Sequence, residues 1–164
     1  MKRWLLIPLF LTACGATTNT IDGVKTYAYE GGDHQEGRIA YKEPHPVGGA
    51  HNAQWQNCGT YTQDLYPEYA VHSLEHGAVW VTYRPDLPQS EVLALQDALD
   101  GRTHTLLSPR REQTAPIVMT AWNAQLELER TSDARVTAFI QKYEQAGTAP
   151  EAGASCSGAY RETQ

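Results

Sequence analysis

Residues 70–83 read Ala-Val-His-Ser-Leu-Glu-His-Gly-Ala-Val-Trp-Val-Thr-Tyr, and they combine a dense hydrophobic segment with two histidines. His72 and His76 are four residues apart, so a single helical turn would place both imidazoles on one face. We expect Gly77 to end that turn. The residues after it alternate with the period of two that is typical of a strand. This stretch therefore predicts a short helical turn that holds two histidines at the mouth of a sheet.

The flanking segments predict an α+β domain. Apolar residues at helical spacing indicate helices over residues 89–100 and from residue 132 or 133 up to Gly147. Period-two or β-branched segments indicate strands over residues 24–29, 38–42, 103–107, 117–122 and 126–129. We expect the first two strands to form a hairpin, and residues 43–57, which are rich in proline and glycine, to form a loop. The order of these elements favours a single domain with a mainly antiparallel sheet and two helices packed on one face.

The first 20 residues have the features of an export signal followed by a tether. Two basic residues precede a short apolar run, and Leu11-Thr12-Ala13-Cys14 resembles the cleavage site of a lipoprotein signal peptide. The apolar run is far shorter than the roughly 20 residues that a membrane-spanning helix needs. We predict, in order, a signal peptide at 1–13, a lipid on Cys14, a flexible tether at 14–20 and a single domain at 21–164. Such a chain would be an extracytoplasmic lipoprotein anchored to a membrane.

The charge balance makes nucleic acid an unsuitable partner. The chain has 13 basic and 19 acidic residues, a formal charge of −6. Removal of the predicted signal peptide takes away two basic residues and gives (13 − 2) − 19 = −8. Nucleic-acid-binding proteins carry a basic stripe instead. An acidic surface is also repelled by anionic lipid, so membrane attachment would depend on the lipid on Cys14.

Two cysteines, Cys58 and Cys156, remain outside the predicted signal. An even pair in an oxidising compartment is most simply a disulfide. This bond would attach the C-terminal tail to the segment that carries the histidines and would contribute about 2–4 kcal/mol of stability. The alternative is that both thiols are soft metal ligands, although no CxxC spacing brings them together.

The histidines suggest a transition-metal site. A pair four residues apart plus a third histidine from a loop supplies the three neutral imidazoles of a copper or zinc centre. We predict His51, His72 and His76 as these ligands. The fourth position would be taken by water or by one of three side chains, His34, His45 or Met119. The predicted function is metal handling outside the cytoplasm, which the sequence favours over catalysis. An unidentified envelope protein is a possible partner.

The segment His-Ser-Leu-Glu-His also fits HxxEH, the inverted motif of some zinc peptidases. In that alternative the chain is a metallohydrolase with Glu75 as the general base. Gly77 and the strand that follows argue against it, since the motif normally lies on a long helix.

Glu151 would be a weak distant ligand, because it lies in a tail rich in proline and glycine. S-ribosylhomocysteine lyases pair a similar motif with a metal-binding cysteine, but they are cytosolic. Glu75 is better explained as a residue that orients an imidazole.

Two further alternatives need no metal. In the first, the histidines bond the loop at 44–57 to the end of the strand, because imidazole both donates and accepts hydrogen bonds. In the second, the chain is an interaction module of the cell envelope. Its binding surface would then consist of aromatic side chains, namely Trp55, Tyr61, Tyr66 and Tyr69.

Several short motifs are spread over most of the predicted domain. They lie at residues 46–51 (PVGGAH), 55–61 (WQNCGTY), 71–79 (VHSLEHGAV), 83–88 (YRPDLP), 120–122 (TAW) and 150–158 (PEAGASCSG). Together these motifs resemble a known bacterial family, domain of unknown function 3105. The resemblance implies an exported or membrane-anchored protein and the extent of its domain, but no activity.

Overall fold

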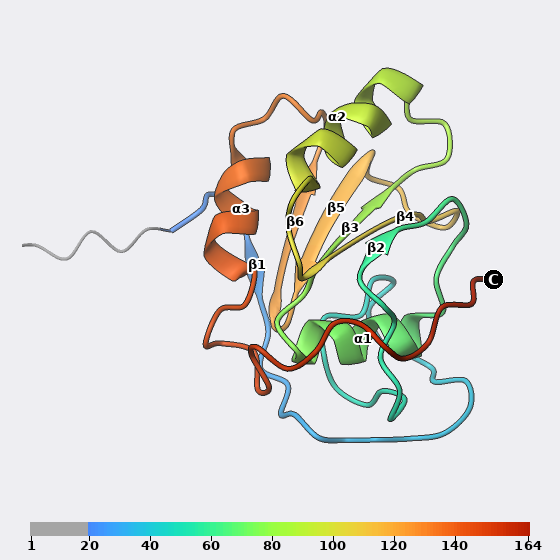
Figure 1. Cartoon of the computed structure of the whole chain (residues 1–164). Helices are drawn as coiled ribbons and strands as arrows, with labels where there is room; N and C mark the ends of the chain where they lie inside the picture. The colour runs from blue at the N-terminus through green and yellow to red at the C-terminus, as the bar shows by residue number, and fades with distance from the viewer. Residues whose placement is uncertain (1–19) are drawn as a thin grey trace, which may run out of the picture.

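A computed structural model describes residues 20–164 (Figure 1). Its elements, in chain order, are β1 (Lys25–Thr26), β2 (Gly59–Thr60), α1 (Pro67–Glu75), β3 (Val79–Tyr83), α2 (Gln89–Leu99), β4 (Thr105–Pro109), β5 (Ile117–Ala121), β6 (Ala124–Leu128) and α3 (Arg135–Tyr143). The strands form one six-stranded sheet in the order β1-β6-β5-β3-β4-β2. The predicted α+β class is therefore confirmed.

The sheet is mixed, with mostly antiparallel neighbours. The pairs β1–β6, β6–β5 and β5–β3 are antiparallel, whereas β3–β4 and β4–β2 are parallel. The parallel pairs exist because two helices serve as crossovers between strands that run in the same direction. Helix α1 connects β2 to β3, and α2 connects β3 to β4.

These two crossovers run in opposite directions across the sheet. Because parallel crossovers are almost always right-handed, α1 and α2 should lie on opposite faces. The side chains agree. In β3, Val79 and Val81 join a hydrophobic cluster with residues of α2 and α3, while Trp80 joins a second cluster with residues of α1. Figure 1 shows α1 well apart from α2 and α3. The prediction of only two helices was wrong, because α1 is a full third helix.

The first cluster contains the helices that the sequence predicts well. Val92, Leu95 and Leu99 of α2 are buried, as is the stripe of α3 formed by Val136, Phe139 and Ile140. Helix α3 is shorter than predicted at both ends. Asn123 adopts φ 61° in the turn between β5 and β6, as expected for the residue that interrupts these two strands.

The predicted N-terminal hairpin was wrong. Only residues 25 and 26 form a strand, and this strand pairs with β6. Residues 38–42 form no strand, and the short strand β2 lies at residues 59 and 60, just past the loop at 43–57. A two-residue edge strand contains too few residues to show a hydrophobic period, so pairing with a distant strand decides the structure here.

The disulfide between Cys58 and Cys156 is present, with a Cα–Cα distance of 5.3 Å, as predicted. It attaches the C-terminal segment next to β2 and rules out the two thiols as separate metal ligands. The predicted signal peptide and Cys14 lie outside the described residues. Within residues 20–164, no helix combines the length and the apolar character needed to cross a membrane.

Candidate metal centre

The C-terminal end of α1 positions three polar side chains. The helix begins with Pro67, a residue suited to a first turn, and ends at Glu75. Ala70, Val71 and Leu74 are buried in the second hydrophobic cluster and fix the orientation of the helix. His72 and Glu75 are three residues apart and therefore project near one another. The next residue, His76, is the C-cap.

His51 reaches this helix end from the loop at 43–57. A β-bridge joins it to His34, with Gln35 N donating to His51 O at 2.7 Å and His51 N donating to Asp33 O at 2.9 Å. The bridge brings two distant loops together over α1. The predicted residues His51 and His72 are consequently neighbours, with ring centroids 4.7 Å apart.

All three predicted ligands are held through the same ring nitrogen. Nδ1 of His51 lies 2.8 Å from Gly49 O, Nδ1 of His72 lies 2.7 Å from Asn52 O, and Nδ1 of His76 lies 2.6 Å from Ser155 O. A carbonyl oxygen only accepts, so each Nδ1 carries the proton. In a neutral imidazole Nε2 then has a free lone pair, the form in which histidine binds a metal.

Nε2 of His51 lies 2.8 Å from Oε2 of Glu75, and both side chains are fully buried, with 0% exposure. Although the two atoms are in contact, neither has a partner in hydrogen-bond geometry among the described residues. With Nδ1 as the donor, a lone pair of nitrogen faces a carboxylate lone pair. Such an arrangement is repulsive unless a proton or a cation lies between the two atoms.

Glu75 is fixed from its other side as well. Its Oε1 accepts a hydrogen bond from Gly32 N at 2.6 Å. Gly31 lies so close that an added Cβ would be 2.5 Å from this oxygen. The loop backbone therefore orients the carboxylate, and Oε2 is directed at His51. Glu75 contacts the free nitrogen of a histidine rather than the protonated one, so it lies on the ligand side and not behind an imidazole.

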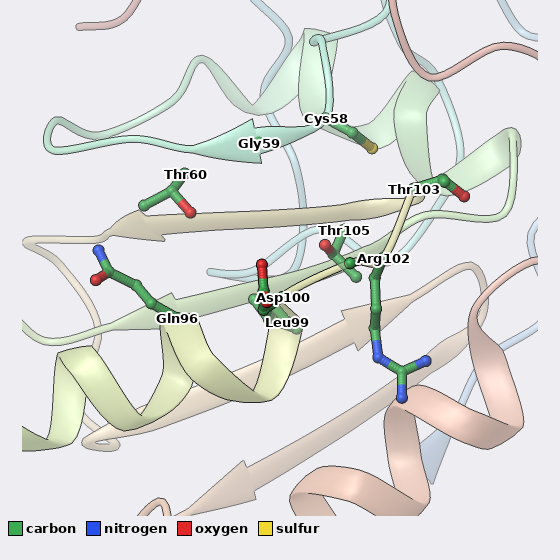
Figure 2. A pocket seen from close by; sticks show the side chains of 10 residues that line it. Cys58, Gly59, Thr60, Gln96, Leu99, Asp100, Arg102, Thr103 and Thr105 are labelled. Carbon is green, nitrogen blue, oxygen red and sulfur yellow. The ribbon is translucent and has the colours of Figure 1, made fainter.

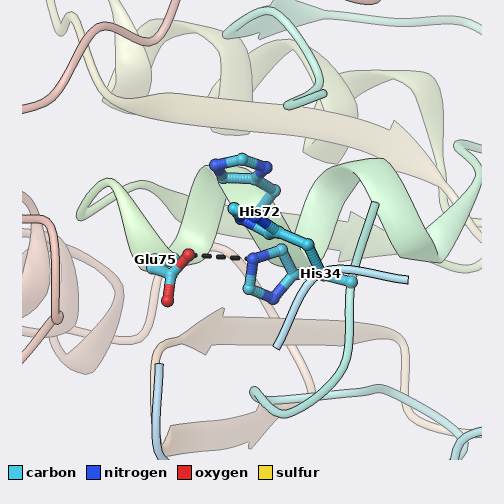
Figure 3. A group of neighbouring side chains, drawn as sticks. His34, His72 and Glu75 are labelled. Atoms are coloured by element: carbon cyan, nitrogen blue, oxygen red, sulfur yellow. Dashed lines mark ion pairs between the residues drawn. The ribbon is translucent and has the colours of Figure 1, made fainter. Parts of the chain in front are cut away.

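Within residues 20–164, the potential ligand atoms form two overlapping groups, and in each group these atoms all lie within 4.8 Å of one another. One contains His34, His51, His72 and Glu75, and the other contains His72, His76 and Glu151. In Figure 3, the side chains of His34, His72 and Glu75 lie close together, and the dashed line from Glu75 marks its ion pair with His51. The structure thus brings His72 together with His51 on one side and with His76 on the other.

The environment keeps His72 neutral. Burial lowers the pKa of His72 to about 4, opposed by its hydrogen bond to the Asn52 carbonyl and reinforced by the neighbouring histidines. At neutral pH its Nε2 is therefore free to bind a cation. Two indoles line the histidine cluster, with Trp55 4.9 Å from His76 and Trp122 5.9 Å from His51 between ring centroids.

The other candidate ligands lie elsewhere. Met119 is buried in the first hydrophobic cluster, with the residues of α2 and α3. His45 is outside both groups, and burial followed by the Arg110 charge lowers its pKa to about 4. Among the proposed fourth ligands only His34 belongs to the cluster. The sequence interpretation gave Glu75 the role of orienting an imidazole, or that of a general base in the alternative, and not that of a ligand. Its spacing of three residues from His72 was a usable signal.

The aromatic residues predicted as a binding surface do not form a single patch. Trp55 lies beside His76, and Tyr61 packs against the second hydrophobic cluster. Tyr66 and Tyr69 form a separate group with Tyr160, whose ring stacks on Tyr69 at 3.7 Å. All four predicted aromatic residues are half-buried.

A separate pocket of about 480 Å³ lies between β2 and the C-terminal end of α2 (Figure 2). Its lining is mainly polar and contains no histidine. Arg102 at its rim already donates to Glu144 at 2.7 Å, and Cys58 is part of the disulfide. This pocket offers no unpaired buried group that would select a ligand.

Comparison with known proteins gives one match. Residues 34–158 match the family described as "Protein of unknown function (DUF3105)", a range that includes the whole histidine cluster and both disulfide cysteines. No curated protein and no solved structure matches the chain. The match covers 158 − 34 + 1 = 125 of the 164 residues. The chain therefore belongs to the DUF3105 family of proteins of unknown function.

Proposed function

We propose that this protein binds one transition-metal ion, zinc or copper, through His51, His72 and Glu75, with His34 completing the site. The single observation that supports the proposal most strongly is the contact between Nε2 of His51 and Oε2 of Glu75. Two ligand atoms about 2.0–2.1 Å from a tetrahedral zinc ion are about 3.3 Å apart. A separation of 2.8 Å requires only a small movement to admit the ion.

A proton shared between His51 and Glu75 is the alternative. It would form a buried imidazolium–carboxylate pair, which is costly to desolvate. It would also leave unexplained why the ring nitrogens of His34 and His72 lie within 4.8 Å of the same carboxylate. A cation at this point is attracted by all four groups, whereas a proton serves only two of them. The convergence therefore favours a metal.

The donor atoms narrow the choice of metal. Imidazole nitrogen and carboxylate oxygen suit zinc and Cu(II), while Cu(I) prefers thiolate and thioether sulfur. Cys58 and Cys156 form a disulfide, and Met119 belongs to the core on the other face of the sheet. Zinc or Cu(II) is therefore the proposed ion.

The metallohydrolase alternative receives less support from the geometry. A general base needs an oxygen within reach of a water molecule. Here Oε1 of Glu75 accepts from Gly32 N, and Oε2 contacts His51. The side chain is fully buried, so neither oxygen faces bulk water. Binding of the ion, rather than hydrolysis, is the function that this carboxylate suits.

The proposal includes a location and a role. A lipid on Cys14 would attach the protein to the outer side of a membrane, and the disulfide suits an oxidising compartment. There the domain would take part in metal handling. Its membrane contact would depend on the lipid, since the chain without its signal peptide has a net charge of (13 − 2) − 19 = −8. The envelope partner that gives or takes the ion is unidentified.

The test is metal analysis of the full chain, purified without a tag and titrated with Zn²⁺ and Cu²⁺. We expect one ion per chain, and a large loss of affinity in Glu75→Gln and His51→Ala. His45→Gln is the matched control, because His45 lies outside both ligand groups. Absence of zinc and copper binding, or equal affinity in all variants, would overturn the proposal.

A further inference from the structure

The C-terminal segment closes over the end of α1. Glu151 N donates to Glu75 O at 3.0 Å, and Gly153 N donates to His76 O at 3.2 Å. Ser155 O in turn accepts from Nδ1 of His76. The first two bonds supply donors to carbonyls at the helix end that otherwise lack a partner. The segment therefore has a fixed position beside the histidines.

The disulfide holds this segment in register. Cys156 is bonded to Cys58, and Cys58 N donates to Cys156 O at 2.7 Å. As a result the Glu151 carboxylate stands 3.3 Å from Nε2 of His76. This contact resembles the one between His51 and Glu75, because both join Nε2 of a histidine to a glutamate carboxylate. It lies nearer the surface.

The two pairings differ in exposure. The Glu75 side chain is 0% exposed, whereas the Glu151 side chain is 51% exposed. His72 belongs to both ligand groups. Since its Nδ1 is occupied by Asn52 O, it has only Nε2 to offer and can ligate at one position at a time. The two positions are therefore alternatives for a single ion.

We infer that His72, His76 and Glu151 form an outer metal position from which a divalent ion passes to the buried position at His51 and Glu75. The inference rests on the proposed function. During transfer the ion stays bound to Nε2 of His72 while its other ligands change from His76 and Glu151 to His51 and Glu75. His72 lies between the two positions, with ring centroids 4.5 Å from His76 and 4.7 Å from His51.

His34 is the competing route, because it is exposed and belongs to the inner group. Its ring stacks on His72 at 5.1 Å, so it could also receive an ion from solvent. The two routes predict different behaviour of a Glu151 variant. If ions arrive through the outer position, loss of the Glu151 carboxylate slows uptake and release. If they arrive through His34, the same variant exchanges at the parent rate.

The experiment measures Zn²⁺ uptake from solution and Zn²⁺ release to a chromophoric chelator by stopped flow, using the full chain. Glu151→Gln is compared with Glu129→Gln, which removes the same charge from an exposed site outside both groups. We expect Glu151→Gln to slow uptake and release about tenfold each, with an affinity within twofold of the parent. Glu129→Gln should match the parent.

Unchanged rates of uptake and release in Glu151→Gln would overturn the outer position, because ions would then arrive by another route such as His34. A loss of affinity in Glu151→Gln at an unchanged uptake rate would also overturn it, because Glu151 would then be a ligand of the final site. Failure of the proposed function looks different. In that case the parent binds no zinc, or Glu75→Gln binds it as tightly as the parent does.

Discussion

The Nε2 atom of His51 lies 2.8 Å from Oε2 of Glu75, and both side chains are fully buried. Gly49 O fixes the proton on Nδ1 of His51, and Gly32 N fixes the carboxylate. The backbone thus holds two electron-rich atoms against each other. Stability and metal affinity should consequently respond in opposite ways when the carboxylate is replaced.

Glu75→Gln tests this opposition in metal-free protein. The glutamine oxygen can still accept from Gly32 N, and its amide can donate to His51 Nε2. We expect the free energy of unfolding in urea with EDTA to stay constant or to rise by up to about 1 kcal/mol. Zinc affinity should fall by about 100-fold, or roughly 2.7 kcal/mol.

A buried imidazolium–carboxylate pair would give the contrary result. Removing the charged acceptor would then lower the free energy of unfolding by about 1.5–3 kcal/mol in the absence of metal. Denaturation curves with and without zinc separate the two cases. His45→Gln again provides the control, since it leaves the pair untouched.

Gly77 is predicted to tolerate no side chain. It has φ 92°, and an added Cβ would lie 2.9 Å from Gln145 Cα, a backbone atom that cannot move alone. We expect Gly77→Ala to lower the free energy of unfolding by about 2–3 kcal/mol. Gly101→Ala is the matched control. It has φ 72° but nothing within 4 Å, and should cost only about 1 kcal/mol.

Equal losses in the two glycine variants would contradict the close approach to Gln145. A larger loss in Gly77→Ala supports it, because the two substitutions share the same backbone strain. Thermal unfolding monitored by circular dichroism is sufficient to compare them.

The sequence predicts well what local spacing controls. The helix stripe of α2 and the pair His72 and His76 follow from residues three or four apart. The sequence could not place His34 against His51, because that contact depends on a β-bridge between two irregular loops. Nor could it predict the hydrogen bond from His76 to the carbonyl of Ser155, which lies 79 residues further along the chain. Contacts of this kind have no period to detect.

His45 should make metal-free protein less stable in acid. Its pKa in the folded state is lowered to about 4, chiefly by burial and next by Arg110, against an ordinary value of 6.5. The unfolded chain therefore takes up a proton first as the pH falls. The contribution of neutral His45 is complete above pH 6.5 and is lost progressively as the pH falls to about 4.

The measurement is urea denaturation between pH 7 and 4 in EDTA. Between pH 7 and 4, the free energy of unfolding should fall by roughly 1–2 kcal/mol less in His45→Gln than in the parent. The difference is modest because water screens a half-buried imidazole. His72, whose pKa is also lowered to about 4, contributes equally to both proteins. Parallel curves for the two proteins would show that His45 gains a proton as easily in the folded state as in the unfolded one.

Removing the disulfide should affect stability and metal exchange together. Cys58 and Cys156 are separated by 98 residues, so replacing both with alanine should lower the free energy of unfolding by about 2–5 kcal/mol. The freed segment would no longer hold Ser155 O on His76 or Glu151 beside it. We expect the folded double variant to exchange zinc slowly, like Glu151→Gln, while the inner ligands keep most of their affinity. His72 and α1 keep their own contacts when the tail is released. Zinc exchange at the parent rate in a folded double variant would therefore contradict the prediction, because it would mean that the tail does not position His76.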